Sequence, residues 1–268
     1  MKLAIIQMAV SENKRENLRR AEEHIAKAAE QGADIAVLPE MFCCPYDTKL
    51  FAVNAELEGG ESFLTMANCA RSNNIWIVAG SMPECDENGK IYNTLYMYRR
   101  DGSVAAKHRK VHLFDVDIKG GQNFKESEVL SAGNSITVAE TEFGKIGLAI
   151  CYDIRFPEMF ARIATHGAKL VIVPASFNMT TGPAHWELIF RARALDNQMF
   201  FAGVATARNA AANYVSYAHS IVTNPWGEVL LQMSEQEGVI VCEVDIDKAN
   251  SIREQLPLLK HRRLDIYN

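Results

Sequence analysis

The stretch that decides the fold is Gly-Leu-Ala-Ile-Cys-Tyr-Asp-Ile-Arg-Phe-Pro-Glu, residues 147–158. Residues 145–150 form a largely apolar run that predicts a buried strand, and residues 156–166 predict a helix. Cys151 therefore lies on the turn between them, where a side chain is exposed above the sheet and faces backbone N–H groups. This placement favours a nucleophile and predicts a lowered thiol pKa. A buried structural cysteine at a strand end fits the same pattern.

The same alternation of strand and helix continues along the chain. Strands are predicted at residues 2–9, 35–38, 75–79, 92–98, 103–107, 136–139 and 169–173, and helices at 14–31, 62–72 and 184–198. Residues 200–244 are strand-rich, with a hairpin turn at 224–227. Strands alternating with helices and followed by antiparallel strands predict an α/β sandwich of mixed sheets. No linker or repeat divides residues 1–268, so we expect a single domain.

Composition excludes several classes of protein. The chain has 268 residues, a formal net charge of -5 and no block of consecutive basic residues, which disfavours a nucleic-acid partner. No apolar run approaches the roughly 18 residues that span a bilayer, so no membrane partner is expected. The apolar opening, residues 1–10, lacks the flanks of a signal peptide, and none of the six cysteines forms a Cys-x-x-Cys pair. We expect a cytoplasmic protein.

Charged residues follow two other predicted strands. Glu40 comes directly after strand 35–38 and Pro39, and Lys110 ends a basic run after strand 103–107. Glu126 lies in the polar stretch 111–131, which has no clean period and predicts a long functional loop. Ligand sites in α/β sheets lie beyond the carboxyl ends of strands. Taken alone, Glu40 could equally be a solvated loop residue, the basic run that ends at Lys110 is more typical of a solvated face, and Glu126 carries no signal of its own.

Together the three motifs resemble a known family. Leu38-Pro39-Glu40, residues 108–113 and residues 147–158 are similar to the nitrilase superfamily of carbon–nitrogen hydrolases, and the resemblance extends to residues 217–220 and 224–227. It implies an αββα sandwich and a Glu-Lys-Cys triad of Glu40, Lys110 and Cys151, with Glu126 as an accessory glutamate. It also implies a homodimer or higher homo-oligomer in which sheet-flanking helices pair.

The residues around the motifs indicate a branch. Cys151 is followed by Tyr152-Asp153, as in amidases, whereas true nitrilases have Trp-Glu there. Residues 114–117 and 176–187 are most similar to the omega-amidase branch, which hydrolyses 2-oxo dicarboxylic acid monoamides such as 2-oxoglutaramate. Deaminated-glutathione amidase, which shares residues 182–187, remains an alternative. Cys43-Cys44, after Glu40, departs locally from the family pattern.

The chemistry explains the need for these residue types. A thiol nucleophile splits amide hydrolysis into thioester formation and thioester hydrolysis. Glu40 would carry the proton in both steps, which requires a raised pKa. By resemblance, the Lys110 ammonium and the Tyr152 backbone N–H would stabilise the oxyanion. Glu126 would position Lys110 or the substrate amide.

Two residues are candidates for binding the rest of the substrate. Arg155 could meet a substrate carboxylate, or could pair with Glu158 at i+3. His185 begins the helix 184–198 and is a candidate pocket residue. That helix has little polar face, so we expect it to be buried all round, at a subunit interface or in the core.

Other schemes stay open. Seven histidines allow a Cys–His pair, although none carries a protease signature. No His/Asp/Glu cluster has the spacing of a metal site, so no metal and no cofactor are expected beside the small-molecule amide substrate. A non-catalytic binding protein on the same fold and a thioester-dependent transferase are the remaining alternatives.

Overall fold

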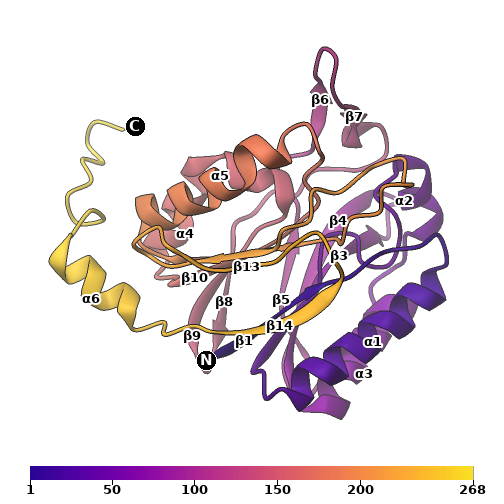
Figure 1. Cartoon of the computed structure of the whole chain (residues 1–268), viewed down its shortest axis with the longest axis horizontal. Helices are drawn as coiled ribbons and strands as arrows, with labels where there is room; N and C mark the ends of the chain where they lie inside the picture. The colour runs from indigo at the N-terminus through magenta and orange to yellow at the C-terminus, as the bar shows by residue number, and fades with distance from the viewer. Residues whose placement is uncertain (268) are drawn as a thin grey trace.

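The computed structural model describes residues 1–267 and places two mixed six-stranded sheets face to face, with helices on both outer sides (Figure 1). The first sheet has the order β14 (Gly238–Glu243), β1 (Lys2–Gln7), β2 (Ile35–Val37), β3 (Trp76–Cys85), β4 (Ile91–Tyr98) and β5 (Val104–Arg109). The second has the order β13 (Val229–Gln232), β12 (Ile221–Thr223), β11 (Phe200–Ala205), β10 (Leu170–Ala175), β9 (Gly144–Leu148) and β8 (Thr137–Thr141).

Two helices cover each sheet. The first sheet carries α1 (Lys14–Glu30) and α3 (Glu61–Asn73), and the second carries α4 (Pro157–Thr165) and α5 (Gly182–Asn197). The shorter elements are α2 (Thr48–Asn54), β6 (Asp115–Asp117), β7 (Asn123–Lys125), η1 (Glu126–Glu128), η2 (Cys151–Arg155) and α6 (Lys248–Gln255). The predicted αββα sandwich is confirmed.

Local sequence signals account for the first helix. The Asn13 side chain accepts a hydrogen bond from the Glu16 backbone N–H at 3.2 Å, which caps α1. Four apolar residues at helical spacing then face the sheet, and all are buried: Leu18, Ala21, Ile25 and Ala28. The capping residue and the apolar stripe therefore place α1 where the sequence predicts it.

The sheets are parallel at their centres and antiparallel at their edges. Strand β2 pairs in parallel with β1 and β3, and β10 pairs in parallel with β9 and β11. Apolar residues of both sheets, among them Ile5, Val37, Leu148 and Ile172, form one buried cluster. Parallel strands bring their carboxyl ends to one edge, so the residues after β2, β9 and β10 emerge near one another.

Two expectations need correction. Helix α5 is not buried all round, because Leu188 and Leu195 are 68% and 43% exposed, while Trp186, Phe190 and Ala194 are buried. The buried residues recur every four positions and face the sheet, so the apolar residues between them lie on the opposite side. The stretch 111–131 is also not a plain loop, since β6 and β7 form a short hairpin that projects from the sandwich (Figure 1).

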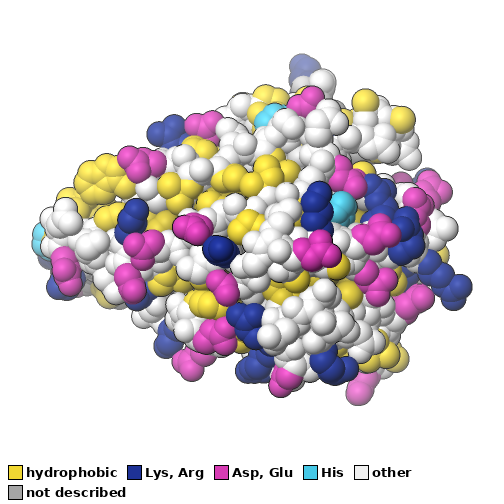
Figure 2. Space-filling model, turned by 60° about the horizontal axis from the view of Figure 1, so that its bottom comes forward, with side chains coloured by type: hydrophobic (Ala, Val, Ile, Leu, Met, Phe, Trp, Pro, Cys, Tyr) yellow, Lys and Arg dark blue, Asp and Glu magenta, His cyan; other side chains and the backbone are white. Residues whose placement is uncertain are grey.

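The surface of the described residues carries charged and apolar side chains side by side. Figure 2 shows acidic and basic side chains interspersed over the face that it presents, with apolar side chains between them. No helix within residues 1–267 combines the length and apolar character needed to cross a bilayer.

Substituting Gly80 tests how closely β3 approaches the chain before Glu40. A Cβ atom there would lie 2.0 Å from the Pro39 carbonyl oxygen and 2.2 Å from that of Leu38. Backbone cannot yield as a flexible side chain can, so Gly80→Ala should lower the free energy of unfolding by about 2–3 kcal/mol, measured in urea. Gly89→Ala is the control, with φ at +77° and no neighbour within 4 Å, and should cost only about 1 kcal/mol. If Gly80→Ala and Gly89→Ala lower the free energy of unfolding equally, the close approach of β3 to Leu38 and Pro39 does not restrict residue 80 to glycine.

Candidate active site

Four sequence-predicted residues meet in the interior between the two sheets. Glu40 follows β2, Lys110 follows β5, Cys151 follows β9, and Glu126 begins η1 after the β6–β7 hairpin. All four are buried, and none exceeds 4% exposure. The structure therefore brings together residues that are separated by up to 111 positions, from Glu40 to Cys151.

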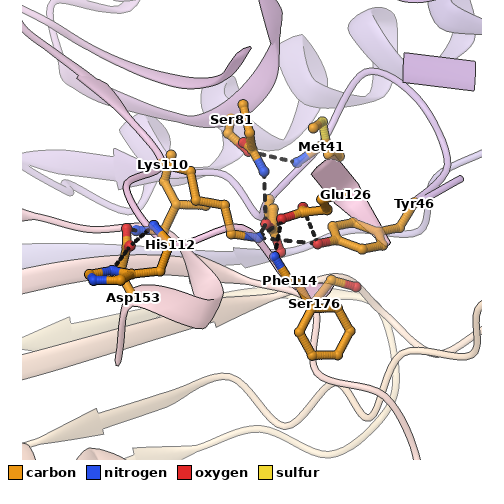
Figure 3. A network of polar contacts seen from close by, with 12 residues as sticks. Met41, Tyr46, Ser81, Lys110, His112, Phe114, Glu126, Asp153 and Ser176 are labelled. Carbon is orange, nitrogen blue, oxygen red and sulfur yellow. Dashed lines mark hydrogen bonds and ion pairs between the residues drawn. The ribbon is translucent and has the colours of Figure 1, made fainter. Parts of the chain in front are cut away.

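The Lys110 ammonium group lies at the centre of this cluster (Figure 3). Its Nζ donates to Glu40 Oε1 at 3.0 Å and to Glu126 Oε1 at 2.9 Å. The Tyr46 hydroxyl oxygen lies 3.2 Å from the same Nζ. Three acceptors match the three donors of an ammonium group, which satisfies this buried charge.

Glu126 fixes the hairpin to the lysine. Its Oε1 accepts hydrogen bonds from Lys110 and, at 2.5 Å, from the Tyr46 hydroxyl. Its Oε2 accepts from the Phe114 backbone N–H at 2.6 Å. Both oxygen atoms are thus held by protein donors, so this carboxylate is placed to orient Lys110. Tyr46 was not predicted, because a single aromatic residue in a loop carries no sequence signal.

Burial and charge set the protonation of the cluster. Burial raises the pKa of Glu40, the Lys110 ammonium opposes this rise, and the nearby Glu126 carboxylate adds to it. Burial would lower the pKa of Lys110, but attraction to the Glu126 and Glu40 carboxylates outweighs it, so this pKa is raised. Lys110 therefore stays charged, and Glu40 has the raised pKa that a proton carrier needs.

The Cys151 thiol differs from the sequence prediction in its electrostatics. Burial and, next, the Glu40 carboxylate raise the pKa of this thiol well above its ordinary value, whereas Lys110 and a backbone hydrogen bond from Ser176 act to lower it. The prediction of a lowered thiol pKa is therefore wrong. A strand-to-helix turn favours the thiolate only if burial beside a carboxylate does not outweigh it. The thiol keeps its proton until a base removes it.

Asp153 fixes the turn that carries the nucleophile. Cys151 has a φ of 44°, in the left-handed region that non-glycine residues rarely adopt. The buried Asp153 carboxylate accepts from the Ile150 backbone N–H at 3.0 Å. It also accepts from the His112 backbone N–H at 2.9 Å and lies 2.8 Å from His112 Nδ1 (Figure 3). One carboxylate thus connects the nucleophile turn to the segment after Lys110.

A small pocket opens beside the nucleophile. Its lining includes Cys151, Ser176 and Asn178, with the aromatic rings of Phe114, Tyr152 and Phe177. Ser176 and the residues after it follow β10, a strand end for which no catalytic role was predicted. Tyr152 lies in the first turn of η2, where backbone N–H groups have no intrahelical acceptor.

Arg155 also lines this pocket. Its guanidinium carbon lies 4.8 Å from the centre of the Phe177 ring and 5.7 Å from that of Tyr152. Its Nη1 lies 3.2 Å from His185 Nδ1. Within residues 1–267 no carboxylate pairs with it, so the alternative pairing with Glu158 does not form. His185 is exposed and contacts Arg155 from outside the pocket lining.

The sequence profile of the carbon–nitrogen hydrolases matches residues 2–254. The chain belongs to this family. It is therefore a hydrolase of carbon–nitrogen bonds in amides. Among residues 1–267 no three His, Cys, Asp or Glu side chains are grouped as a metal site.

The hydrolase is similar to several known proteins over nearly its whole length. It is 46% identical to omega-amidase NIT2 of Xenopus tropicalis, and the alignment covers 100% of this chain and 96% of that protein. It is 44% identical to human omega-amidase NIT2, and this alignment covers 99% of this chain and 96% of the human protein. The crystal structure of Saccharomyces cerevisiae Nit3, described as a member of branch 10 of the nitrilase superfamily, superposes on this chain with a TM-score of 0.90. The two sequences are 39% identical, and the superposition covers 98% of this chain and 96% of Nit3.

Replacing Lys110 by arginine tests whether its position or only its charge matters. Three oxygen atoms lie 2.9–3.2 Å from Nζ, and a planar guanidinium cannot take that point. Lys110→Arg should lower kcat more than tenfold, a barrier increase above about 1.4 kcal/mol, and nearly as much as Lys110→Ala. Lys107→Arg, at a half-buried lysine of β5, is the control and should keep activity. If the kcat of Lys110→Arg stays within tenfold of the wild-type value, Lys110 contributes only a diffuse positive charge.

Proposed function

We propose that this hydrolase is an omega-amidase that converts a 2-oxo dicarboxylic acid monoamide, such as 2-oxoglutaramate, to the dicarboxylate and ammonia. The observation that carries the proposal is one pocket lined by both a nucleophile and an unpaired cation. Cys151, which lies beside Glu40 and Lys110, lines the pocket together with Arg155, which has no carboxylate partner within residues 1–267. A short substrate that carries both an amide and a carboxylate matches these two groups.

The first half of the reaction forms a thioester. Glu40 takes the thiol proton as Cys151 Sγ attacks the amide carbonyl carbon. The oxyanion is stabilised by the Lys110 ammonium and the Tyr152 backbone N–H. The C–N bond then breaks, and Glu40 gives its proton to the leaving nitrogen, which departs as ammonia. The raised pKa of Glu40 supports both the uptake and the return of this proton.

The second half hydrolyses the thioester. Glu40, again a carboxylate, takes a proton from water as the water oxygen attacks the thioester carbonyl. The C–S bond breaks, and the proton on Glu40 returns to the sulfur. The neutral resting thiol expected from the raised pKa of Cys151 is also the species that this step regenerates. Glu126 holds Lys110 in place in both halves.

The residues that line the pocket support a substrate that carries a carboxylate as well as an amide. Arg155 is half-buried against Phe177, so a ligand carboxylate there would form a partly desolvated, charge-assisted pair. A neutral amide would leave the guanidinium unpaired, which costs free energy of binding. The aromatic walls Phe114, Tyr152 and Phe177 enclose the space beside Cys151, which supports a short amide over the longer deaminated glutathione.

We also propose a homodimer that forms through α5. Leu188 and Leu195 expose apolar side chains on its outer face, and Trp226 is 53% exposed on the hairpin turn beside it. Arg191 of the same helix holds that turn through a hydrogen bond to the Gly227 carbonyl. A second copy of the chain would cover this apolar face. The six unpaired cysteines support a reducing, cytoplasmic location for the protein.

Removing the nucleophile tests the covalent route. Cys151→Ala should abolish ammonia release from 2-oxoglutaramate while the thermal unfolding midpoint stays close to that of the wild type, because only one small side chain is lost. Mass spectrometry of the quenched wild-type reaction should find the acyl adduct on the peptide that contains Cys151. Cys69→Ala, at a buried thiol on α3, is the matched control and should keep turnover. Wild-type activity in Cys151→Ala would refute the mechanism.

Replacing Arg155 tests the substrate class. Arg155→Met keeps much of the side-chain volume but removes the cation, so kcat/KM for 2-oxoglutaramate should fall at least tenfold more than for neutral propionamide, about 1.4 kcal/mol. Arg162→Met, at an exposed arginine of α4, is the control and should change neither value. Equal losses on both substrates would give Arg155 a structural role. No preference of the wild type for 2-oxoglutaramate would refute the omega-amidase assignment and leave the general amidase.

A further inference from the structure

A second cavity borders the catalytic cluster next to the substrate pocket, with which it shares Ser176 and Tyr214. This cavity, called the rear cavity below, is lined by Glu40, Tyr46, Thr206, Tyr214 and Ser216 among others, and neither Cys151 nor Arg155 lines it. The substrate pocket is lined by Cys151 and Arg155 and not by Glu40. Glu40 and the nucleophile thus each open onto a different space.

Tyr214 forms the wall between the two spaces. It lines both of them, as does Ser176. Its hydroxyl donates a hydrogen bond to the Ser176 carbonyl oxygen at 2.6 Å. Its ring packs against Tyr46 and Phe124, with ring centres 4.7 Å and 5.5 Å away. These contacts hold Tyr214 in a fixed place where the substrate pocket and the rear cavity adjoin.

The rear cavity is suited to water. It offers about 40 Å³ to the centres of water molecules, and one water needs roughly 10–15 Å³ on that measure. Glu40 Oε2 is buried and has no hydrogen-bond partner in the described chain, which is costly for a carboxylate unless water supplies the missing bond. Thr206 lines the same cavity, and its hydroxyl forms no hydrogen bond within residues 1–267, so it is available to a water there.

The rear cavity continues toward the surface. An outer hollow shares Val10, Pro45, Tyr46, Asn209 and Ala212 with its lining and adds the exposed residues Asn213 and Ala211. Ala212 belongs to both linings, so it lies where the outer hollow meets the rear cavity. Water can reach Glu40 by this path without passing Arg155 or Cys151.

We infer that the rear cavity is the binding site and entry route of the water that hydrolyses the thioester. The inference rests on the proposed function, because it concerns the second half of that reaction. While the acyl group on Cys151 fills the substrate pocket, water approaches that side only by displacing it. Water in the rear cavity instead meets the base first. Glu40 takes one proton, the oxygen attacks the thioester carbonyl, the C–S bond breaks, and the proton passes to the sulfur.

Narrowing the junction at Ala212 tests the inference. Ala212→Leu should slow thioester hydrolysis about tenfold, a barrier increase of about 1.4 kcal/mol, and leave acylation unchanged. Rapid-quench measurements with 2-oxoglutaramate should then show a burst of one ammonia per active site. The fraction of enzyme that carries the Cys151 thioester at steady state, measured by intact mass spectrometry, should be higher than in the wild type.

Two further variants make the result decisive. Ala210→Leu adds the same side chain at an exposed position two residues away that lines neither space, and it should behave as wild type. Thr206→Val keeps the shape but removes a hydroxyl from the rear cavity, so it should raise the thioester share even if Ala212→Leu does not fold.

Three outcomes are distinguishable. A selective fall in the thioester hydrolysis rate supports the inference. Unchanged rates in Ala212→Leu and Thr206→Val, or equal slowing of both half-reactions, would overturn it and place water entry on the substrate side. Wild-type enzyme that forms no thioester on Cys151 would instead overturn the proposed function.

Discussion

The buried ammonium of Lys110 is the interaction on which the site depends. A lysine with no exposed side-chain area is stable only if acceptors replace its lost hydration, and here Glu40, Glu126 and Tyr46 do so at 2.9–3.2 Å. These acceptors come from the end of β2, from η1 and from the segment before α2. One charge therefore fixes three chain segments that the sheets alone would leave independent. Loss of any acceptor would leave a buried charge poorly solvated.

The same burial decides how protons move. Burial, helped by the nearby Glu126 carboxylate, raises the pKa of Glu40 against the opposing effect of the Lys110 ammonium, and burial beside Glu40 raises the pKa of Cys151. The nucleophile is therefore a neutral thiol next to a base, and not a preformed thiolate. Attack and proton transfer are coupled in such a pair, so the distance from base to thiol matters more than the acidity of the thiol alone. Asp153 serves this geometry by holding the Cys151 turn against the His112 segment.

The surroundings of the cluster divide the reaction in space. Arg155 and the aromatic rings line the substrate pocket, the rear cavity meets Glu40, and Tyr214 lines both. The base is thus the only member of the triad that opens onto the rear cavity, as neither Lys110 nor Cys151 lines it. The β6–β7 hairpin contributes to both sides, because Phe124 packs on Tyr214 while Phe114 lines the substrate pocket.

The sequence by itself determined the strand-to-helix turn at Cys151, the αββα sandwich and the grouping of Glu40, Lys110 and Glu126 as candidates. Local apolar periodicity indicated the turn and an α/β sandwich of mixed sheets, whereas the αββα order and the grouping of these residues came from the resemblance of three motifs to the nitrilase superfamily. The sequence left Arg155 with two possible partners and predicted that the residues of α5 would be buried on every side. Only the tertiary structure showed that Glu158 does not pair with Arg155, that Leu188 faces outward, and that burial raises rather than lowers the pKa of Cys151. The parts that Tyr46, Ser176 and Tyr214 play in the site were also visible only in the tertiary structure. A residue's burial and its partners depend on segments far apart in the chain, whereas periodicity reports only on neighbours along one helix or strand.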